Sequence, residues 1–512
     1  MPGESPYYNV VDPPYGAKGD GTTDDTAAIQ AAIAAAAPSA ASTGNTVFFP
    51  AGRYLVSSAL GVPPGVTLQG VGWNTPGEET DTFAGSWIFV DAGASFSPVT
   101  LSSSGGAVRD LGFNVHNQST TGAPASAEPM ILITHDNCLV ADVCLYNPYG
   151  GIYIDGGAQA VIRRVFGQPI QYGIKIDASE DTNYIDSIHF WTYWQGSGTP
   201  VGDYQLANGT AIGLFRCDNP HISNVFALHY NVGLSLSTGA NGIPHKVHLV
   251  NADFDGCVTG IHIYSPGTST NRASIEMSNV TIQAPSGPGV PTGNGIWVEA
   301  GSAYTMVQAA NVRVTGAGGN AIEIDAGDVD FYGSNISIED WSGSYGFYIS
   351  SSSSYAWLDI GFAYTSGGTP FYPVAQFRLT GGGVQLHASG ANAVTPNGAV
   401  LTGGTASIDT ADGYDSGTGL YTVPEAGNYL VMAAVNAFSF AGPFTMPFAI
   451  VHNGSHLVNA AFYGTSSFQP GASLQAIVTC SKGDRIGVAA GAASGSYQGG
   501  YTAVASFSVV NL

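Results

Sequence analysis

Charged residues are scarce in this sequence, and basic residues are the scarcest of them. Lys and Arg total 13 against 36 Asp and Glu, so the formal net charge is −23. Charged residues make up only 10% of the chain, whereas a typical domain has about 25%. Nucleic acids and anionic membranes attract proteins through a basic surface, which this composition cannot supply. We therefore expect no nucleic-acid binding and no membrane insertion.

Long apolar runs and paired cysteines are also missing. The longest apolar helical stretch, residues 27–37, is Ala-rich and well short of the about 18 residues that suggest a transmembrane helix. No cysteine belongs to a CxxC pair and no Cys/His spacing suggests zinc, so we expect no disulfide framework, no metal and no cofactor. The five cysteines are Cys138, Cys144, Cys217, Cys257 and Cys480.

The N-terminal residues, MPGESPYYNV, contain neither the basic nor the apolar segment of a secretory signal. We therefore expect synthesis in the cytoplasm. If the protein acts outside the cell, we expect delivery by a route other than ordinary secretion, unless a leader precedes this sequence.

Glycine and aromatic residues are abundant instead. The chain has 70 Gly, 26 Tyr and 23 Phe, and 44% of its residues are hydrophobic. Disordered chains lack aromatic and β-branched residues, so this composition predicts an all-β protein with many turns. One helix is expected over residues 22–37, where Thr and Asp precede an Ala-rich body. We interpret the acidic segment 19–25, GDGTTDD, as helix capping rather than metal binding.

Two short units alternate from about residue 105 to residue 360. One begins with Gly or Ala and continues with alternating apolar residues, as in GIHIY (260–264) and GIWVE (295–299). The other is a small polar residue followed by apolar-x-apolar, as in NVTI (279–282) and NVRV (311–314). Recurrence at irregular intervals above about 22 residues is typical of a right-handed parallel β-helix with insertions at one corner. The polar residue is usually Asn, which can bond to the next coil, so we interpret this column as structural.

The N-terminal segment also resembles a known family. GAKGDGTTDDTAAIQAAI (16–33), with VFFPAGRYLVSSAL (47–60) and VTLQGVGW (66–73), is similar to the start of pectate-lyase-superfamily proteins. That group includes glycoside hydrolases and many bacteriophage tailspikes. The resemblance implies the β-helix fold but leaves the reaction open, because the fold hosts lyases, hydrolases and adhesins.

The C-terminal part changes character. Short alternating strands with Pro and Gly turns predict a jelly-roll sandwich. YTVPEAGNYLV (421–431) and CSKGDRIGV (480–488) resemble globular heads of the tumour-necrosis-factor and complement type, which are trimers. We therefore expect a homotrimer of all-β chains. Each chain would comprise an N-terminal cap and first coils (1–75), a parallel β-helix (76–360), a connector (361–410) and a jelly-roll head (411–512).

Aligning the Gly-led units predicts which side chains share the outer surface. Adjacent coils lie about 4.8 Å apart, so acidic residues from neighbouring coils should form one patch and raise at least one pKa by mutual repulsion. Glycoside hydrolysis needs such a carboxyl pair, and an aromatic ring beside it can contact a sugar. The first candidate site therefore combines Glu299, Glu323 and Asp325 as catalytic groups with Trp297, His262 and Tyr348 as substrate-binding groups.

Aligning the second unit gives a second candidate site. Outward columns should place Asp253 and Asp255 near aromatic residues of the insertion at 191–209. The same columns contain Phe226 and Leu228, so we expect this face to be either the subunit interface or an inter-subunit groove. Its candidate catalytic residues are Asp253 and Asp255, and its candidate substrate-binding residues are His189, Trp191, Tyr193 and Trp194.

Together these patterns predict a tailspike-like protein that hydrolyses a bacterial surface polysaccharide and resides in the virion. Two alternatives remain open: an adhesin that binds glycan without cutting it, and a polysaccharide lyase. A lyase needs a basic residue and cations. Lys175 with Asp155 and Asp177 is the one arrangement that suggests a lyase site, and we interpret it as a surface ion pair. Of the two candidate sites, we favour the patch with Glu299, Glu323 and Asp325.

Overall fold

The computed structural model describes most of the chain up to residue 358 and separate stretches beyond it. The described residues are 7–37, 45–76, 82–285, 292–316, 318–341, 345–351, 353–358, 363–364, 369–372, 377–379, 385–389, 405–409, 413–424, 426–438, 444–464, 471–490, 494–495 and 501–511. The chain divides into two compact units, one of residues 1–356 and 361–368 and the other of residues 357–360 and 369–512.

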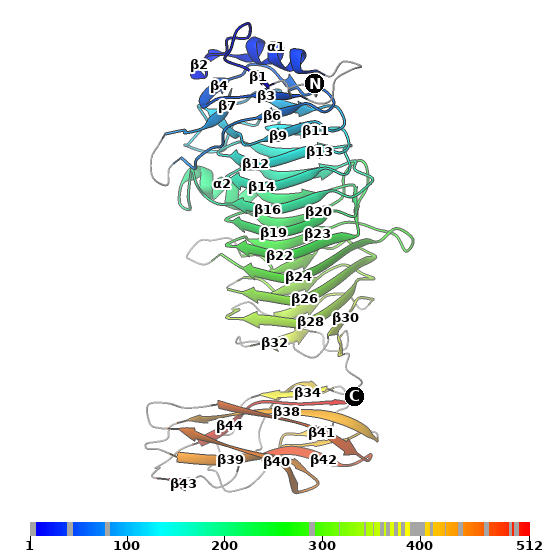
Figure 1. The fold of residues 1–512 in the computed structure, drawn as a ribbon. Helices are drawn as coiled ribbons and strands as arrows, with labels where there is room; N and C mark the ends of the chain where they lie inside the picture. Colours follow the sequence, from blue (N-terminus) through cyan, green and yellow to red (C-terminus); the bar gives the residue numbers. More distant parts are fainter. Residues whose placement is uncertain are drawn as a thin grey trace, which may run out of the picture. The chain divides into compact units, whose positions relative to one another are not determined.

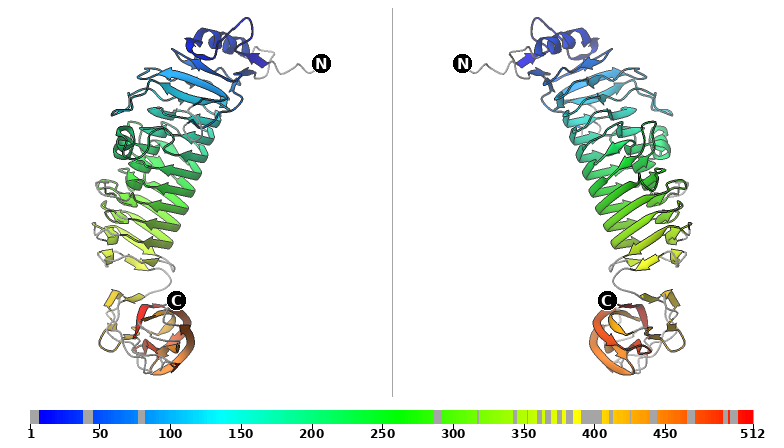
Figure 2. Two further views of the ribbon diagram at one scale, coloured as in Figure 1. Left: turned by 90° about the vertical axis from the view of Figure 1, so that its left-hand side faces the viewer. Right: turned by 90° about the vertical axis from the view of Figure 1, so that its right-hand side faces the viewer.

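The first unit is a parallel β-helix whose coils stack as rungs (Figures 1 and 2). The first sheet includes β1 (Tyr7–Asn9), β2 (Asp20–Asp24), β3 (Thr46–Phe48), β4 (Gly52–Leu55), β6 (Thr67–Gln69), β7 (Ser86–Asp91), β9 (Ala107–Arg109), β10 (Gly112–His116), β12 (Leu139–Leu145), β14 (Val161–Gly167), β16 (Tyr184–Phe190), β19 (His221–Leu228), β22 (Val247–Asp255), β24 (Ala273–Gln283), β26 (Thr305–Thr315) and β28 (Asp330–Glu339). The second sheet includes β5 (Leu60–Gly61), β8 (Val99–Leu101), β11 (Ile131–Ile133), β13 (Gly150–Asp155), β15 (Tyr172–Asp177), β17 (Thr210–Leu214), β20 (Val232–Ser237), β23 (Thr259–Tyr264), β25 (Ile296–Val298), β27 (Ile322–Ile324) and β29 (Tyr345–Ile349). Shorter strands are β18 (Cys217–Asp218), β21 (Pro244–His245), β30 (Tyr355–Leu358), β31 (Ala363–Tyr364), β32 (Thr369–Tyr372) and β33 (Phe377–Leu379).

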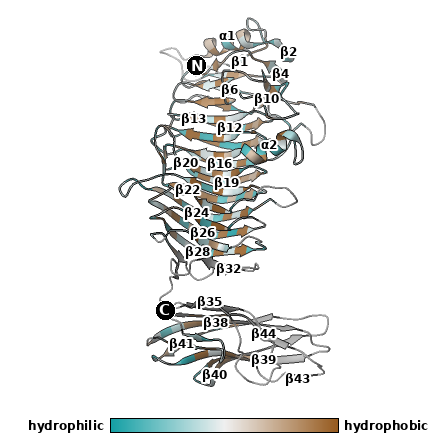
Figure 3. Ribbon diagram, turned by 180° about the vertical axis from the view of Figure 1, so that it is seen from behind, coloured by the Kyte–Doolittle hydropathy of each residue, from teal (hydrophilic) through white to brown (hydrophobic). Residues whose placement is uncertain are grey.

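Alternating apolar residues fill the interior of the coil, and polar residues alternate with them along the strands (Figure 3). One interior column stacks Ile152, Ile174, Ile212, Leu234, Ile261, Ile296 and Ile322 on successive coils, all of them buried. Burying each such side chain contributes roughly 1.5–3 kcal/mol. The Gly that opens each repeat is required by close packing, since a Cβ on Gly233 would lie 2.4 Å from the ring of Phe254.

An asparagine ladder bends the strands of the first sheet. Its members are Asn224, Asn251, Asn279, Asn311 and Asn335, with φ between 52° and 56°. Each Asn after the first donates its Nδ2–H to Oδ1 of the preceding one, at 2.8 to 3.2 Å. Asn tolerates the left-handed conformation better than most residues, and its side chain continues the bonding between coils. The column is therefore structural, as the sequence predicted.

A helix covers the N-terminal end of the coils (Figure 1). This helix, α1 (Thr26–Ala36), begins four residues later than predicted and buries Ile29. The predicted capping role of segment 19–25 holds for Asp24, whose Oδ1 accepts the N–H of Thr26 at 3.0 Å, but is wrong for Asp25, whose side chain makes no cap bond to α1. Its carboxylate instead accepts the backbone N–H groups of Lys18 and Gly19, at 2.6 and 2.9 Å. These bonds hold the turn before the helix rather than the helix itself.

The insertion after β16 forms a second helix that the sequence pattern did not reveal. This helix, α2 (Pro200–Asn208), is capped by Thr199, whose Oγ1 accepts the N–H of Gly202 at 3.1 Å. Pro200 at its first position is a common start signal. In Figure 1 it stands beside β14 and β16. Within the described part of the chain, no helix is long and apolar enough to cross a membrane.

The second unit consists of two antiparallel sheets, which is consistent with the predicted jelly roll. One contains β35 (Thr405–Asp409), β34 (Gln385–Ser389), β44 (Tyr501–Asn511), β38 (Gly427–Phe438) and β41 (Gly471–Cys480). The other contains β36 (Tyr414–Asp415), β37 (Leu420–Thr422), β42 (Arg485–Ala490), β39 (Phe444–His452), β40 (Ser455–Gly464) and β43 (Ser494–Gly495). Strands β34 and β35 come from the segment predicted as a connector, much of which lies outside the described residues. The predicted all-β fold of a β-helix followed by a jelly roll is confirmed.

Candidate functional site

The outward column of the second sheet has the alignment that the sequence predicted. Tyr153, Lys175, Gly213, Ser235, His262, Trp297, Glu323 and Tyr348 occupy equivalent positions on successive coils. Glu299 and Asp325 each lie one residue beyond their strands. Their backbone N–H groups bond to the carbonyls of Ile263 and Val298, at 2.9 and 2.8 Å, which keeps the coils aligned there.

An aromatic pair connects two of the predicted acidic residues. The rings of His262 and Trp297 stack with centroids 4.7 Å apart and planes at 16°. His262 Nε2 lies 2.8 Å from Glu299 Oε2, and Trp297 Nε1–H donates to Asp325 Oδ2 at 3.0 Å. Burial lowers the pKa of His262, although Glu299 opposes the shift. The imidazole is therefore neutral at neutral pH and can donate its Nε2–H to the carboxylate.

Glu323 has the most unusual environment of the three carboxyl groups. Burial and, next, the charge of Asp325 raise its pKa, while hydrogen bonds from Asn320 and Asn294 oppose the shift. Asn294 Nδ2–H donates to Glu323 Oε2 at 2.5 Å. The nearby Asp325 carboxyl group favours the protonated form of Glu323, so Glu323 holds its proton more tightly than an ordinary glutamate.

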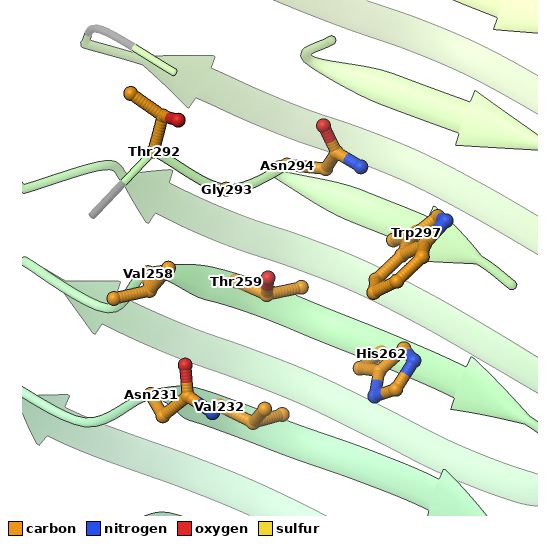
Figure 4. Close-up of a pocket in the computed structure, with 9 residues that line it drawn as sticks. All are labelled: Asn231, Val232, Val258, Thr259, His262, Thr292, Gly293, Asn294 and Trp297. Atoms are coloured by element: carbon orange, nitrogen blue, oxygen red, sulfur yellow. The ribbon is translucent and has the colours of Figure 1, made fainter. Parts of the chain in front are cut away.

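A pocket of about 320 Å³ opens beside these residues (Figure 4). It is lined by Asn231, Val232, Val258, Thr259, His262, Thr292, Gly293, Asn294 and Trp297. His262 and Trp297 were predicted, and Glu323 bonds to the pocket residue Asn294. Tyr348 lies one coil beyond Glu323 and stacks on Tyr345, with centroids 5.4 Å apart, so it does not line the pocket.

Sequence reasoning missed the polar side of this pocket. Thr259 and Asn294 stand directly before the Gly that opens a repeat, and Asn320 stands before the corresponding Ala. That recurring polar position was a usable signal. The outward columns defined from the Gly onward do not include this position, which lies one residue earlier.

The second candidate face also has the predicted alignment. Phe166, His189, Phe226, Asp253, Thr281 and Arg313 stack on successive coils of the first sheet. Trp191 is 42% exposed and stacks on Phe226, with centroids 5.8 Å apart. His189 contacts Phe226 edge-on, with centroids 5.0 Å apart. Phe226 is thus covered by a residue of its own chain.

Two expectations for this face are wrong. The alternation that aligns the second unit also places Cys144, Tyr146 and Gln168 in its outward columns, but all three are buried. Tyr193 and Trp194, expected to be exposed, are partly buried against a cluster that contains Trp87, Phe89, Cys144 and Tyr146. The physical reason is that Trp73 and Phe83, together with Tyr193 and Trp194 from a distant part of the chain, pack over the start of the column. Gln168 anchors the segment that contains Trp194, because its Oε1 accepts the N–H groups of residues 194 and 195 at 2.7 and 3.0 Å.

Two carboxyl groups remain on this face. Burial raises the pKa of Asp253, with a further contribution from Asp255, while Arg313 opposes the shift. Arg313 is itself paired with Glu339, at 2.8 Å. Both candidate faces therefore offer a carboxyl group that holds its proton more tightly than usual.

Lys175 does not form the surface ion pair that we expected. Within the described part of the chain it has no carboxylate oxygen within 4.0 Å, and its Nζ lies over the rings of Tyr153 and Phe215, at 4.5 and 4.8 Å. Burial and the nearby Asp155 and Asp177 raise the pKa of Tyr153 to about 12. Lys175 is therefore held by aromatic faces.

A possible metal-ligand set lies in the C-terminal unit. Among the described residues, His452, Cys480 and Asp484 form one group whose ligand atoms lie within 4.8 Å of one another. Hydrogen bonds from Asn453, Ser481 and His452 lower the pKa of Asp484 to about 2. Burial raises the pKa of the Cys480 thiol to about 11. The carboxylate thus already has hydrogen-bond donors and the thiol is protonated, so the contacts serve to fix the turn before β42.

Comparisons with known proteins agree with the predicted superfamily resemblance. Residues 7–110 match the family described as rhamnogalacturonase A/epimerase, pectate lyase-like. The mannuronan C5-epimerase AlgE4 of Azotobacter vinelandii is 50% identical over 72 residues, which cover 13% of this chain and 12% of that protein. Alginate lyase 7 of the same organism is 60% identical over 50 residues, which cover 10% of this chain and 5% of that protein. The chain thus spans only a small part of the curated relatives that it matches.

Solved structures resemble both units. The N-terminal fragment of gene product 12 of bacteriophage Phi29 shares 14% identity over 72% of each chain, with a TM-score of 0.50. The Dettilon tailspike protein shares 13% identity over 98% of this chain and 94% of that chain, with a TM-score of 0.49. The globular domain of zebrafish complement 1qA shares 15% identity over 25% of this chain and 98% of that chain, with a TM-score of 0.20. Residues 7–110 thus match a pectate lyase-like family, and the β-helix fold is shared with a phage protein.

Proposed function

We propose that this protein binds a bacterial surface polysaccharide and cuts it by endo-glycosidic hydrolysis. The observation that carries the proposal is the environment of Glu323, a half-buried carboxyl group with a raised pKa that bonds to a pocket residue. A general acid must hold a proton near neutral pH and release it to the leaving oxygen. In this proposal Glu323 is that acid.

The partner carboxylate comes from the same patch. Asp325 accepts from Trp297 and Glu299 contacts His262, so each is held by one aromatic residue of the pocket wall. A carboxylate held in this way can activate water or attack the sugar, and the distance between the two carboxyl groups decides which of these occurs. We assign this role to Asp325 and Glu299 together. Asp253 and Asp255 rank below them because the described pocket is lined by residues of the second sheet, among them His262 and Trp297, and not by residues of that face.

The lining of the pocket favours a neutral sugar. No Lys or Arg is among its nine residues, and the chain carries a net charge of −23. A polyuronate would meet repulsion and find no cation in the pocket to neutralise its carboxylates. This argues against the lyase alternative. The curated relatives are named for mannuronan and alginate. We propose a neutral sugar instead as the substrate of this chain.

The test measures new chain ends on capsular polysaccharide and lipopolysaccharide preparations. New reducing ends without the absorbance of unsaturated uronates support hydrolysis, and unsaturated ends would mean a lyase. No new ends across a broad panel would favour the non-catalytic adhesin. The variants Glu299→Gln, Glu323→Gln and Asp325→Asn should still bind glycan but cut it at least about 100-fold more slowly. Full activity in all three, with loss in Asp253→Asn, would move the site to the other face.

We also propose that the chain forms a homotrimer and resides in the virion. Ile477 on β41 is 68% exposed, and Leu457 on β40 is 45% exposed. Large exposed apolar residues of this kind often meet another subunit. The resemblance of the C-terminal unit to trimeric heads and the fold shared with a phage protein support the same assembly. Light scattering should give three times the chain mass of 52.5 kDa, and a monomer would refute the trimer.

A further inference from the structure

The pocket beside Glu323 has two chemically different ends. The stacked rings of His262 and Trp297 form one end, and Val258 and Thr292 lie at the other (Figure 4). Val232 and Val258 are both buried and supply the apolar part of the lining. A ligand that fills this space must therefore present a ring edge to the aromatic end and a small apolar group near the valines.

The polar side chains of the pocket divide by whether they already have partners. Both polar atoms of the Asn294 side chain have hydrogen-bond partners. Its Nδ2 donates to Glu323, and its Oδ1 accepts the N–H of Asn320 at 2.8 Å. The side chains of Asn231 and Thr259, by contrast, make no hydrogen bond to any other residue that the structure describes. Thr259 is only 7% exposed. Both residues line the pocket, so their polar groups are available to a ligand that enters it.

The backbone at Gly293 packs tightly against Val258 at this end of the pocket. Gly293 approaches it so closely that a Cβ at that position would lie 2.1 Å from the Val258 carbonyl oxygen. A side chain cannot be accommodated there. Away from the aromatic rings the pocket is lined by Val232 and Val258, the Asn231 amide and the Thr259 hydroxyl, and we call this part the recess.

We infer that this recess binds the acetamido group of an N-acetylated sugar. An acetamide combines one methyl group, one N–H donor and one carbonyl acceptor, which match the valines, the Asn231 amide and the Thr259 hydroxyl. A plain hexose would leave the apolar part without contact, and a uronate would find no cation. The inference deepens the proposed function by naming the class of sugar that lies next to Glu323, and it rests on that function for the source of the sugar.

The test uses four monosaccharides and measures binding without turnover. N-acetylglucosamine, N-acetylgalactosamine, glucose and galactose are each added at millimolar concentration, and saturation transfer from protein to ligand is recorded by NMR. At least one acetylated sugar should bind, its methyl group should receive the most saturation, and the two hexoses should bind more weakly. Thr259→Val keeps the volume of the side chain and should weaken binding about three- to tenfold, the effect of one lost hydrogen bond. Asn231→Ala should have a similar effect.

A matched control separates this result from a general loss of structure. Thr281→Val makes the same change on β24 of the first sheet, away from the pocket, and should leave binding unchanged. The inference is overturned if none of the four sugars binds, if glucose binds as well as N-acetylglucosamine, or if both pocket variants bind normally. Because no bond is cleaved in this assay, absence of hydrolysis on every polysaccharide would refute the proposed reaction and leave the pocket result standing.

Discussion

The replacement Glu323→Gln should act on catalysis and on stability in opposite directions. Glutamine keeps the size of the side chain, and its carbonyl oxygen can still accept from Asn294, which now bonds to Glu323 at 2.5 Å. It cannot deliver a proton. The hydrolytic rate should therefore fall by at least about 100-fold, which corresponds to about 2.7 kcal/mol of activation free energy.

The stability effect follows from the direction of the pKa shift. The pKa of Glu323 is raised in the folded protein, chiefly by burial. A raised pKa means that the folded state binds the proton more tightly, so its contribution to stability is present below the unfolded pKa and is lost as the pH rises through the folded pKa. Glutamine is neutral at every pH and avoids this loss. The variant should match the wild type at low pH and become more stable than the wild type once the pH exceeds the folded pKa of Glu323.

Glu339→Gln provides a control of opposite sign. Arg313 and, next, Ser337 lower the pKa of Glu339, so its stabilising contribution is present above the unfolded pKa and is lost in acid. Its glutamine variant should be less stable at neutral pH and should hydrolyse normally. The measurements are reducing-end release and thermal unfolding from pH 4 to pH 8. If Glu323→Gln is less stable at neutral pH and retains full activity, Glu323 is an ionised structural residue and the reasoning is refuted.

Three further perturbations test other parts of the structure. Asn311→Ala removes two ladder bonds and forces Ala into a left-handed conformation, so urea denaturation should show a loss of about 2–4 kcal/mol in unfolding free energy, and less for Asn311→Gly. Gln168→Leu leaves the backbone N–H groups of residues 194 and 195 without their acceptor, so limited proteolysis should cut that loop faster than in the wild type. Asp253→Asn and Asp255→Asn should keep the reducing-end rate within about twofold of the wild type, and a loss comparable to that of Glu323→Gln would contradict the ranking of the two faces.

The alignment of both outward columns could be predicted because it depends only on local pattern. Strand residues alternate in direction, and the Gly before each repeat marks the same point on every coil. Once Gly233 is aligned with Gly260, the positions of His262 and its neighbours on adjacent coils follow. The Asn ladder was predictable for the same reason, since one residue type recurs where the chain must bend.

The covering of the second face could not be predicted because it depends on contacts between distant segments. Nothing near Cys144 or Tyr146 in the sequence shows that Trp73 and Phe83 pack against their cluster, or that Trp194 returns to the same place. Likewise, the stacking of Trp191 on Phe226 joins an insertion to a strand of the next coil. Alternation specifies which way a side chain points, but not whether another segment lies there.

The helix at the start of the β-helix has a consequence for how the protein behaves in solution. The first coil of such a stack ends in a row of unpaired backbone N–H and C=O groups, which could accept a strand from a second molecule. α1 contacts β1, β3 and β5 at this end. Its own backbone groups are bonded within the helix, so it offers no edge for further pairing. By covering this end, a helix of 11 residues keeps the coil from growing molecule by molecule into a fibre.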